Sequence, residues 1–96
     1  MWANPQAALE HLFNETEAAH GRYEATELGG IYDERWADWY AQRLIERGYN
    51  HLVQDDSVDE EGLSALLVRL FELYKASGSG EKWSAYFARE IIEDQG

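Results

Sequence analysis

The chain is organised around one stretch, Asp33-Glu34-Arg35-Trp36-Ala37-Asp38-Trp39-Tyr40-Ala41, which holds two tryptophans and a tyrosine within five residues. The stretch is predicted to begin a helix. Asp33 is a good N-cap, and Glu34 places an acid in the first turn, where the helix dipole favours negative charge. The helix should end near Arg47, because Gly48 is the expected residue after a helix C-terminus.

At 100° per residue this helix has two faces. The aliphatic face consists of Ala37, Ala41, Leu44 and Ile45. The adjoining face carries an aromatic and arginine stripe, made of Trp36, Trp39, Tyr40, Arg43 and Arg47. The preferred interpretation buries both faces and makes the helix central. The alternative is that the stripe lines a groove for a ligand or partner, because Trp, Tyr and Arg dominate binding hot spots.

Position on the helical wheel separates the two tryptophans of the stripe. Trp36 lies closer to the aliphatic face and should point toward the core, whereas Trp39 should lie nearer the edge. A weak homodimer or a protein partner is therefore expected to dock through Trp39. The two arginines should pair with acids of the preceding helix, because an unpaired arginine on an aromatic stripe is hard to desolvate. The candidate acids are Glu17 and Glu24.

The rest of the chain predicts a single all-α domain over residues 1–96, loosely an antiparallel four-helix bundle. Its helices are expected near residues 5–27, 33–47, 57–76 and 81–94. Asn4 and Pro5 mark the first helix start, and Ser57 with Glu60 forms a capping box for the third. The segment 49–53 is too short for an independent helix and should be extended or a 3₁₀ turn. The third helix carries the clearest core stripe: Leu63, Leu66, Leu67, Leu70, Phe71 and Tyr74.

His20 is the most unusual residue, because it lies near the middle of the first helix's apolar arc. Glu17 precedes it with the Glu-x-x-His spacing of di-iron bundles, but that architecture needs a second copy, and the other histidines, His11 and His51, do not supply one. The preferred interpretation is a hydrogen-bonded structural histidine. The alternatives are a simpler metal site, and an acid–base pair of His20 with Glu17 or Glu24.

Composition limits the class of protein. Ninety-six residues with 45% hydrophobic content can bury a core, and the formal charge of −11 should repel nucleic acid and anionic membranes. That charge suits solubility above all, and also a cationic ligand or a basic partner. The sequence has no cysteine, no apolar run of membrane-spanning length and no signal peptide, so a cytoplasmic location is expected. No cofactor motif is present.

Two short patterns resemble a known group of proteins. Glu15-Thr16-Glu17 with His20 reads E-T-E-x-x-H, and Trp36, Trp39, Tyr40 and Ala41 read W-x-x-W-Y-A. Together, over roughly residues 8–47, they resemble a group of small uncharacterised bacterial helical proteins. The resemblance implies a bacterial source and no particular activity.

The sequence therefore favours a non-enzymatic protein-interaction or accessory domain that uses the aromatic and arginine stripe. The alternative function is a small-ligand or metal-binding protein with a pocket around His20, Tyr23 and Trp39. Pocket shape should separate the two, because ligand sites are concave and mostly enclosed.

Overall fold

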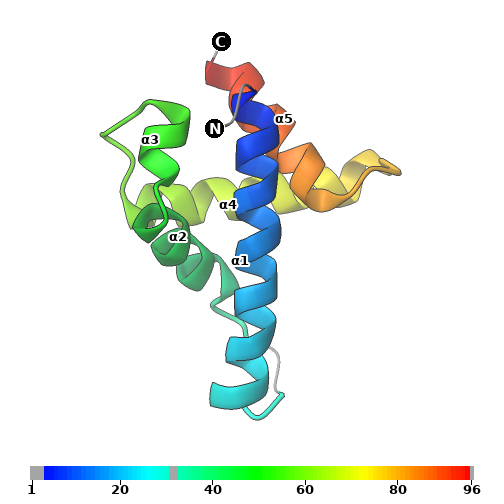
Figure 1. Ribbon diagram of the computed structural model, residues 1–96. Helices are drawn as coiled ribbons and strands as arrows, with labels where there is room; N and C mark the ends of the chain where they lie inside the picture. The colour runs from blue at the N-terminus through cyan, green and yellow to red at the C-terminus, as the bar shows by residue number, and fades with distance from the viewer. Residues whose placement is uncertain (1–3, 31–32, 96) are drawn as a thin grey trace.

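The computed structural model describes residues 4–30 and 33–95, in which all regular structure is helical. The helices are α1 (Pro5–Glu27), α2 (Trp36–Glu46), α3 (Tyr49–Val53), α4 (Glu60–Ser77) and α5 (Trp83–Gln95) (Figure 1). The all-α prediction is confirmed, with one more helix than expected. No helix within these residues combines the length and the apolar character needed to cross a membrane.

The helices pack as two pairs, α1 with α5 and α2 with α4. Phe13 contacts Phe87 while Glu17 bonds to Trp83, so α1 and α5 run in opposite directions. In Figure 1, α4 runs across α1 instead of along it. The finer prediction of an antiparallel four-helix bundle is therefore corrected. The reason is length: α1 has 23 residues and α2 has 11, and at about 1.5 Å per residue α2 cannot match the span of α1.

The core lies where the two pairs meet. On α4 the predicted stripe is confirmed, with Leu63, Leu67 and Leu70 buried and the other three members partly buried against the core. The other large side chains buried with them are Leu9, Leu12, Phe13, Leu44, Tyr49, Val53, Tyr86, Phe87 and Ile91. Every helix contributes to this one cluster, which agrees with a single domain.

Two helix ends follow the sequence signals. The Asn4 side chain accepts a hydrogen bond from the Gln6 backbone N–H at 2.9 Å, and Pro5 occupies the first turn of α1. Gly48 follows α2 in the left-handed conformation, with φ 98°, which residues with a side chain adopt at a cost. These two ends were predictable because their chemistry is entirely local.

The start of α2 is different from the prediction. Asp33 does not cap the helix, which begins three residues later at Trp36. One Asp33 carboxylate oxygen accepts from the Arg35 backbone N–H at 2.9 Å, and the other faces His20. Because a contact with α1 occupies the carboxylate, the predicted cap position becomes part of a turn.

The start of α4 is also corrected. Asp59, and not Ser57, is the N-cap, and its carboxylate accepts from the Gly62 backbone N–H at 2.8 Å. Ser57 instead donates its hydroxyl and its backbone N–H to Asp55. Asp and Ser have similar capping strength, so local pattern alone could not rank the two positions.

The segment that follows α2 forms the short helix α3, which corrects the expectation of an extended segment or a 3₁₀ turn. Five residues are too few for a helix that is stable alone. Tyr49 and Val53 are both buried in the core, so tertiary packing stabilises this turn of helix.

Replacing Leu67 by Ala should lower the free energy of unfolding by about 2–5 kcal/mol, because the side chain is fully buried and its loss leaves a cavity. The matched control is Val68→Ala, one residue along the same helix and 45% exposed, which should change stability by less than about 0.5 kcal/mol. Urea denaturation of both variants measures this. Similar losses at the two positions would contradict the assignment of α4 as a core helix.

Candidate functional site

His20 lies at the centre of the polar contacts between α1 and the turn that precedes α2. Its Nε2 atom is 2.9 Å from an Asp33 carboxylate oxygen, and its Nδ1 atom is 3.9 Å from a Glu24 oxygen. The side chains of His20 and Asp33 are only 9% and 11% exposed. The predicted burial and hydrogen bonding of His20 are therefore confirmed, and a purely structural role stays a prediction. Its main partner, Asp33, was not among the predicted ones.

Beside His20 lies a cavity of about 380 Å³, called the aromatic cavity below. Each of the four long helices supplies at least two of its lining residues. They are Glu17, His20 and Glu24 on α1, Trp36 and Tyr40 on α2, Phe71 and Tyr74 on α4, and Trp83 and Phe87 on α5. The volume falls within the roughly 300–1,000 Å³ typical of ligand pockets. A mainly apolar wall with a few polar groups is also typical of such pockets.

Successive rings around the aromatic cavity meet edge to face. Ring centroids lie 5.4 Å apart for Trp36 and Phe71, 5.7 Å for Trp36 and Tyr40, and 6.0 Å for Tyr40 and Trp83. The series continues through Phe87 at 5.2 Å from Trp83, and all four pairs are inclined by 71–89°. Edge-to-face contacts are a preferred aromatic geometry, so the rings hold one another in place along the wall of the cavity.

The polar groups of this wall are held by hydrogen bonds within the protein. Trp83 donates its indole N–H to a Glu17 oxygen at 2.8 Å, and Lys82 lies 3.6 Å from the other oxygen. Glu24 accepts from the Asp33 backbone N–H at 3.1 Å. Among the described lining residues there is no lysine or arginine, so the cavity has negative potential.

Tyr40 reports on this potential. Burial raises the pKa of its phenol above the ordinary tyrosine value, and the negative charges of Glu17 and Glu24 raise the pKa further. Both effects disfavour a second negative charge at this position. The same field would favour a positive charge in the cavity.

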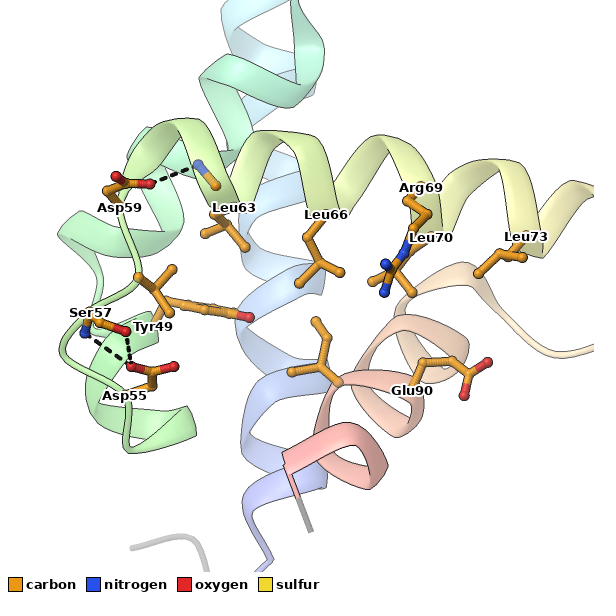
Figure 2. Close-up of a pocket in the computed structure, with 13 residues that line it drawn as sticks. Tyr49, Asp55, Ser57, Asp59, Leu63, Leu66, Arg69, Leu70, Leu73 and Glu90 are labelled. Atoms are coloured by element: carbon orange, nitrogen blue, oxygen red, sulfur yellow. Dashed lines mark hydrogen bonds between the residues drawn. The ribbon is translucent and has the colours of Figure 1, made fainter.

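A second cavity, of about 440 Å³, lies between α4, α5 and the loop before α4 (Figure 2). Leu63, Leu66 and Leu70 line up along α4 on one side of it. Its acidic groups already serve the local structure, since Asp55 accepts from Ser57 and Asp59 caps α4. This cavity therefore has few polar groups free to orient a ligand, and the aromatic cavity is the better candidate.

The residues of the predicted stripe do not share one surface. Trp36 and Tyr40 line the aromatic cavity together with the predicted site residues His20 and Glu17, and Trp36 packs against the core as expected. Trp39 lies on another side, with its ring 5.0 Å from His20 and 5.3 Å from Tyr23, and it lines a separate cavity with Tyr23. Its role in partner binding stays a prediction.

Arg43 and Arg47 line a fourth, smaller cavity between α1 and α2. The predicted pairing of these arginines with Glu17 or Glu24 is wrong. In the described part of the chain neither arginine has a carboxylate within 4.0 Å. The reason is that Trp83 and Lys82 hold Glu17, while Asp33 and His20 hold Glu24.

Sequence reasoning missed half of the aromatic cavity. Phe71 and Tyr74 were expected only in the core stripe of their helix, and neither Trp83 nor Phe87 was among the predicted site residues. The available signal was that each pair is spaced i, i+3 or i+4, which puts both rings on one helix face. What the spacing could not show is that the faces of α4 and α5 leave a space between them.

Among the side chains described for residues 4–30 and 33–93, no group of three or more His, Asp or Glu is arranged to hold a metal ion. Comparison of the chain with known protein families, curated proteins and solved structures found no match. The resemblance to small bacterial proteins therefore stays a prediction, and the function must be argued from the site itself.

Replacing Asp33 by Ala should lower the free energy of unfolding by about 1–3 kcal/mol, because buried His20 loses its hydrogen-bond partner. The control is Asp56→Ala, which removes an equal charge from an exposed loop position and should change stability by less than about 0.5 kcal/mol. Chemical denaturation of both variants tests this. Equal effects would mean that the His20–Asp33 contact adds nothing to stability.

Tyr40 should make the protein less stable in alkali. Its pKa is raised in the folded state, so the unfolded chain loses the phenolic proton first, near the ordinary value of roughly 10. Stability from this group is present below that pH and is lost as pH rises toward the folded-state pKa. Tyr40→Phe should therefore lose less stability in alkali than the unchanged protein, as measured by melting temperature against pH. A tyrosine NMR titration showing Tyr40 ionising at the ordinary value would contradict the argument.

Proposed function

We propose that this protein is a non-enzymatic binding domain, and that its aromatic cavity binds an organic cation carrying a methylated ammonium group. The observation that carries the proposal is the composition of the cavity wall, which combines six aromatic rings with two glutamates. The proposal keeps the ligand-binding interpretation of the sequence, but with Trp36 and Tyr40 in the wall in place of Tyr23 and Trp39.

The rings supply the first part of the recognition. An aromatic face carries negative charge, and a cation over it gains roughly 0.5–1 kcal/mol when exposed and about 2 kcal/mol when desolvated. Rings inclined at 71–89° to their neighbours line the cavity from several helices. Quaternary ammonium groups are the ligands most often recognised by such ring-lined sites.

The glutamates supply the second part. Glu17 and Glu24 lie about two turns apart on the same face of α1, and both act on the Tyr40 phenol strongly enough to raise its pKa. A neutral or anionic ligand gains nothing from this field, whereas a cation does. The formal charge of −11 on the whole chain works in the same direction.

The contacts that Glu17 and Glu24 already make within the protein explain why the cation should be methylated. Three of the four carboxylate oxygens of Glu17 and Glu24 already face a donor within the protein, namely the Trp83 indole, Lys82 and the Asp33 backbone N–H, and the fourth lies 3.9 Å from His20 Nδ1. A primary ammonium ion is strongly hydrated and needs acceptors to replace its water. A fully methylated ammonium carries the charge but no N–H group, so it needs only charge and ring faces.

The geometry of His20 favours binding over catalysis. A general acid or base must reach the reacting group with a nitrogen atom. Nε2 of His20 bonds to Asp33 and Nδ1 faces Glu24, so both nitrogens are directed at carboxylates of the protein. The acid–base pairs considered from the sequence are therefore weaker candidates.

The test compares choline with its uncharged isostere, in which carbon replaces the ammonium nitrogen. Isotope-edited NMR of the indole N–H groups locates binding, and calorimetry measures affinity. Choline should shift Trp36 and Trp83 saturably and bind about tenfold more tightly than the isostere, equivalent to about 1.4 kcal/mol. Peptides with trimethyllysine and with unmodified lysine show whether the group comes from a small molecule or from a partner protein.

Paired variants give the controls. Glu17→Gln with Glu24→Gln should weaken choline binding by about tenfold, whereas Glu27→Gln with Glu46→Gln, which removes equal charge at exposed positions, should not. Trp36→Leu should weaken binding and Trp39→Leu should not. Equal affinity for choline and its isostere would overturn cation recognition but leave a ligand site. Shifts centred on Trp39 and Tyr23 would favour the other cavity, and no saturable shift at any tryptophan would overturn the proposal.

A further inference from the structure

The cations of this chain divide into two groups. The sequence holds 8 basic and 19 acidic residues, and Arg35, Lys75, Lys82 and Arg89 each pair with an acid. Among the side chains that the structure describes, those of residues 4–30 and 33–93, the other four have no carboxylate within 4.0 Å. They are Arg22, Arg43, Arg47 and Arg69. In a chain with so many acids, four unpaired arginines need an explanation.

Three of these four line one cavity of about 210 Å³ and are called the arginine cluster below: Arg22, Arg43 and Arg47. Arg22 comes from α1. Arg43 lies in the last turn of α2, the helix that packs beside α1 (Figure 1), and Arg47 is the residue directly after the end of α2. Ala18 and Ala19 contribute only small side chains to the wall, which leaves room between the arginines. The acid in the same wall, Glu15, pairs with His11.

We propose that the arginine cluster binds a phosphate group. Three guanidinium groups bring three positive charges and planar sets of N–H donors, which match phosphate oxygens two at a time. A carboxylate offers only two oxygens and one charge, enough for a single arginine. A phosphate monoester offers three oxygens and a charge of about −1.5 to −2, so it can engage all three.

The acidic surface elsewhere does not prevent this. Charges separated by more than a Debye length, about 8 Å at physiological ionic strength, are largely screened. The three arginines would touch the ligand directly, and Arg43 is half-buried, where screening is weaker. The site is independent of the aromatic cavity, because the two share no lining residue.

The test is an NMR titration of the arginine Nε–H groups with inorganic phosphate, against chloride at equal ionic strength. Phosphate should shift Arg22, Arg43 and Arg47 saturably and leave Arg69 unchanged, since Arg69 is unpaired but lines the cavity of Figure 2. Arg43→Gln and Arg47→Gln should each weaken binding by about tenfold, and Arg69→Gln should have no effect. Arg43→Lys should restore only part of the affinity, because the charge remains and the planar donor set is lost.

Further ligands test the assignment. Free phosphoserine and a phosphoserine peptide show whether the phosphate belongs to a small molecule or to a partner protein, and either should bind more tightly than acetate. Acetate binding as tightly as phosphate would overturn the assignment to phosphate. Shifts of equal size at Arg69, or none that saturate in the arginine cluster, would overturn the site itself, whatever choline does at the aromatic cavity.

Discussion

The hydrogen bond between His20 and Asp33 is the contact on which the geometry of the aromatic cavity and of the arginine cluster depends. It joins the middle of α1 to the turn before α2, and it removes Asp33 from the role of helix cap. As a result α2 begins at Trp36. Two of the three aromatic residues of α2 then fall on different sides of the histidine, with ring centroids 4.9 Å from it for Tyr40 and 5.0 Å for Trp39.

This division explains why one stripe of sequence serves several surfaces. Trp36 and Tyr40 face the rings of α4 and α5, whereas Arg43 and Arg47 lie along α1 near Arg22. The helix is short and central, so each of its sides meets a different neighbour. Arg43 and Arg47 are thereby kept apart from Glu17 and Glu24, the acids with which they were expected to pair. The glutamates line the aromatic cavity, and the arginines line the cavity of the arginine cluster.

Sequence predicted what local chemistry and periodicity determine. The helical class, the Asn4 cap, the Gly48 terminus and the buried leucines of α4 all follow from residues near one another in the chain. Apart from the choice between Ser57 and Asp59 as the cap of α4, the corrections share a cause, because each involves a partner distant in sequence. Asp33 was predicted to be a helix N-cap from the residues next to it, but its carboxylate bonds to His20, thirteen residues earlier. The aromatic cavity is lined by residues of four helices. The spacing of residues along a single helix cannot predict a cavity that lies between four of them.

The pairing of α1 with α5 has a consequence for synthesis of the chain. Glu17 and Trp83, which bond in the folded state, are separated by 66 positions. Contacts between distant segments form late, because the intervening chain must first be ordered. On the ribosome, α2, α3 and α4 emerge while the apolar face of α1 still lacks its main cover. The protein can therefore complete its core only when the last helix leaves the exit tunnel, and until then a chaperone that recognises exposed Leu9 and Phe13 would find its target in every nascent chain.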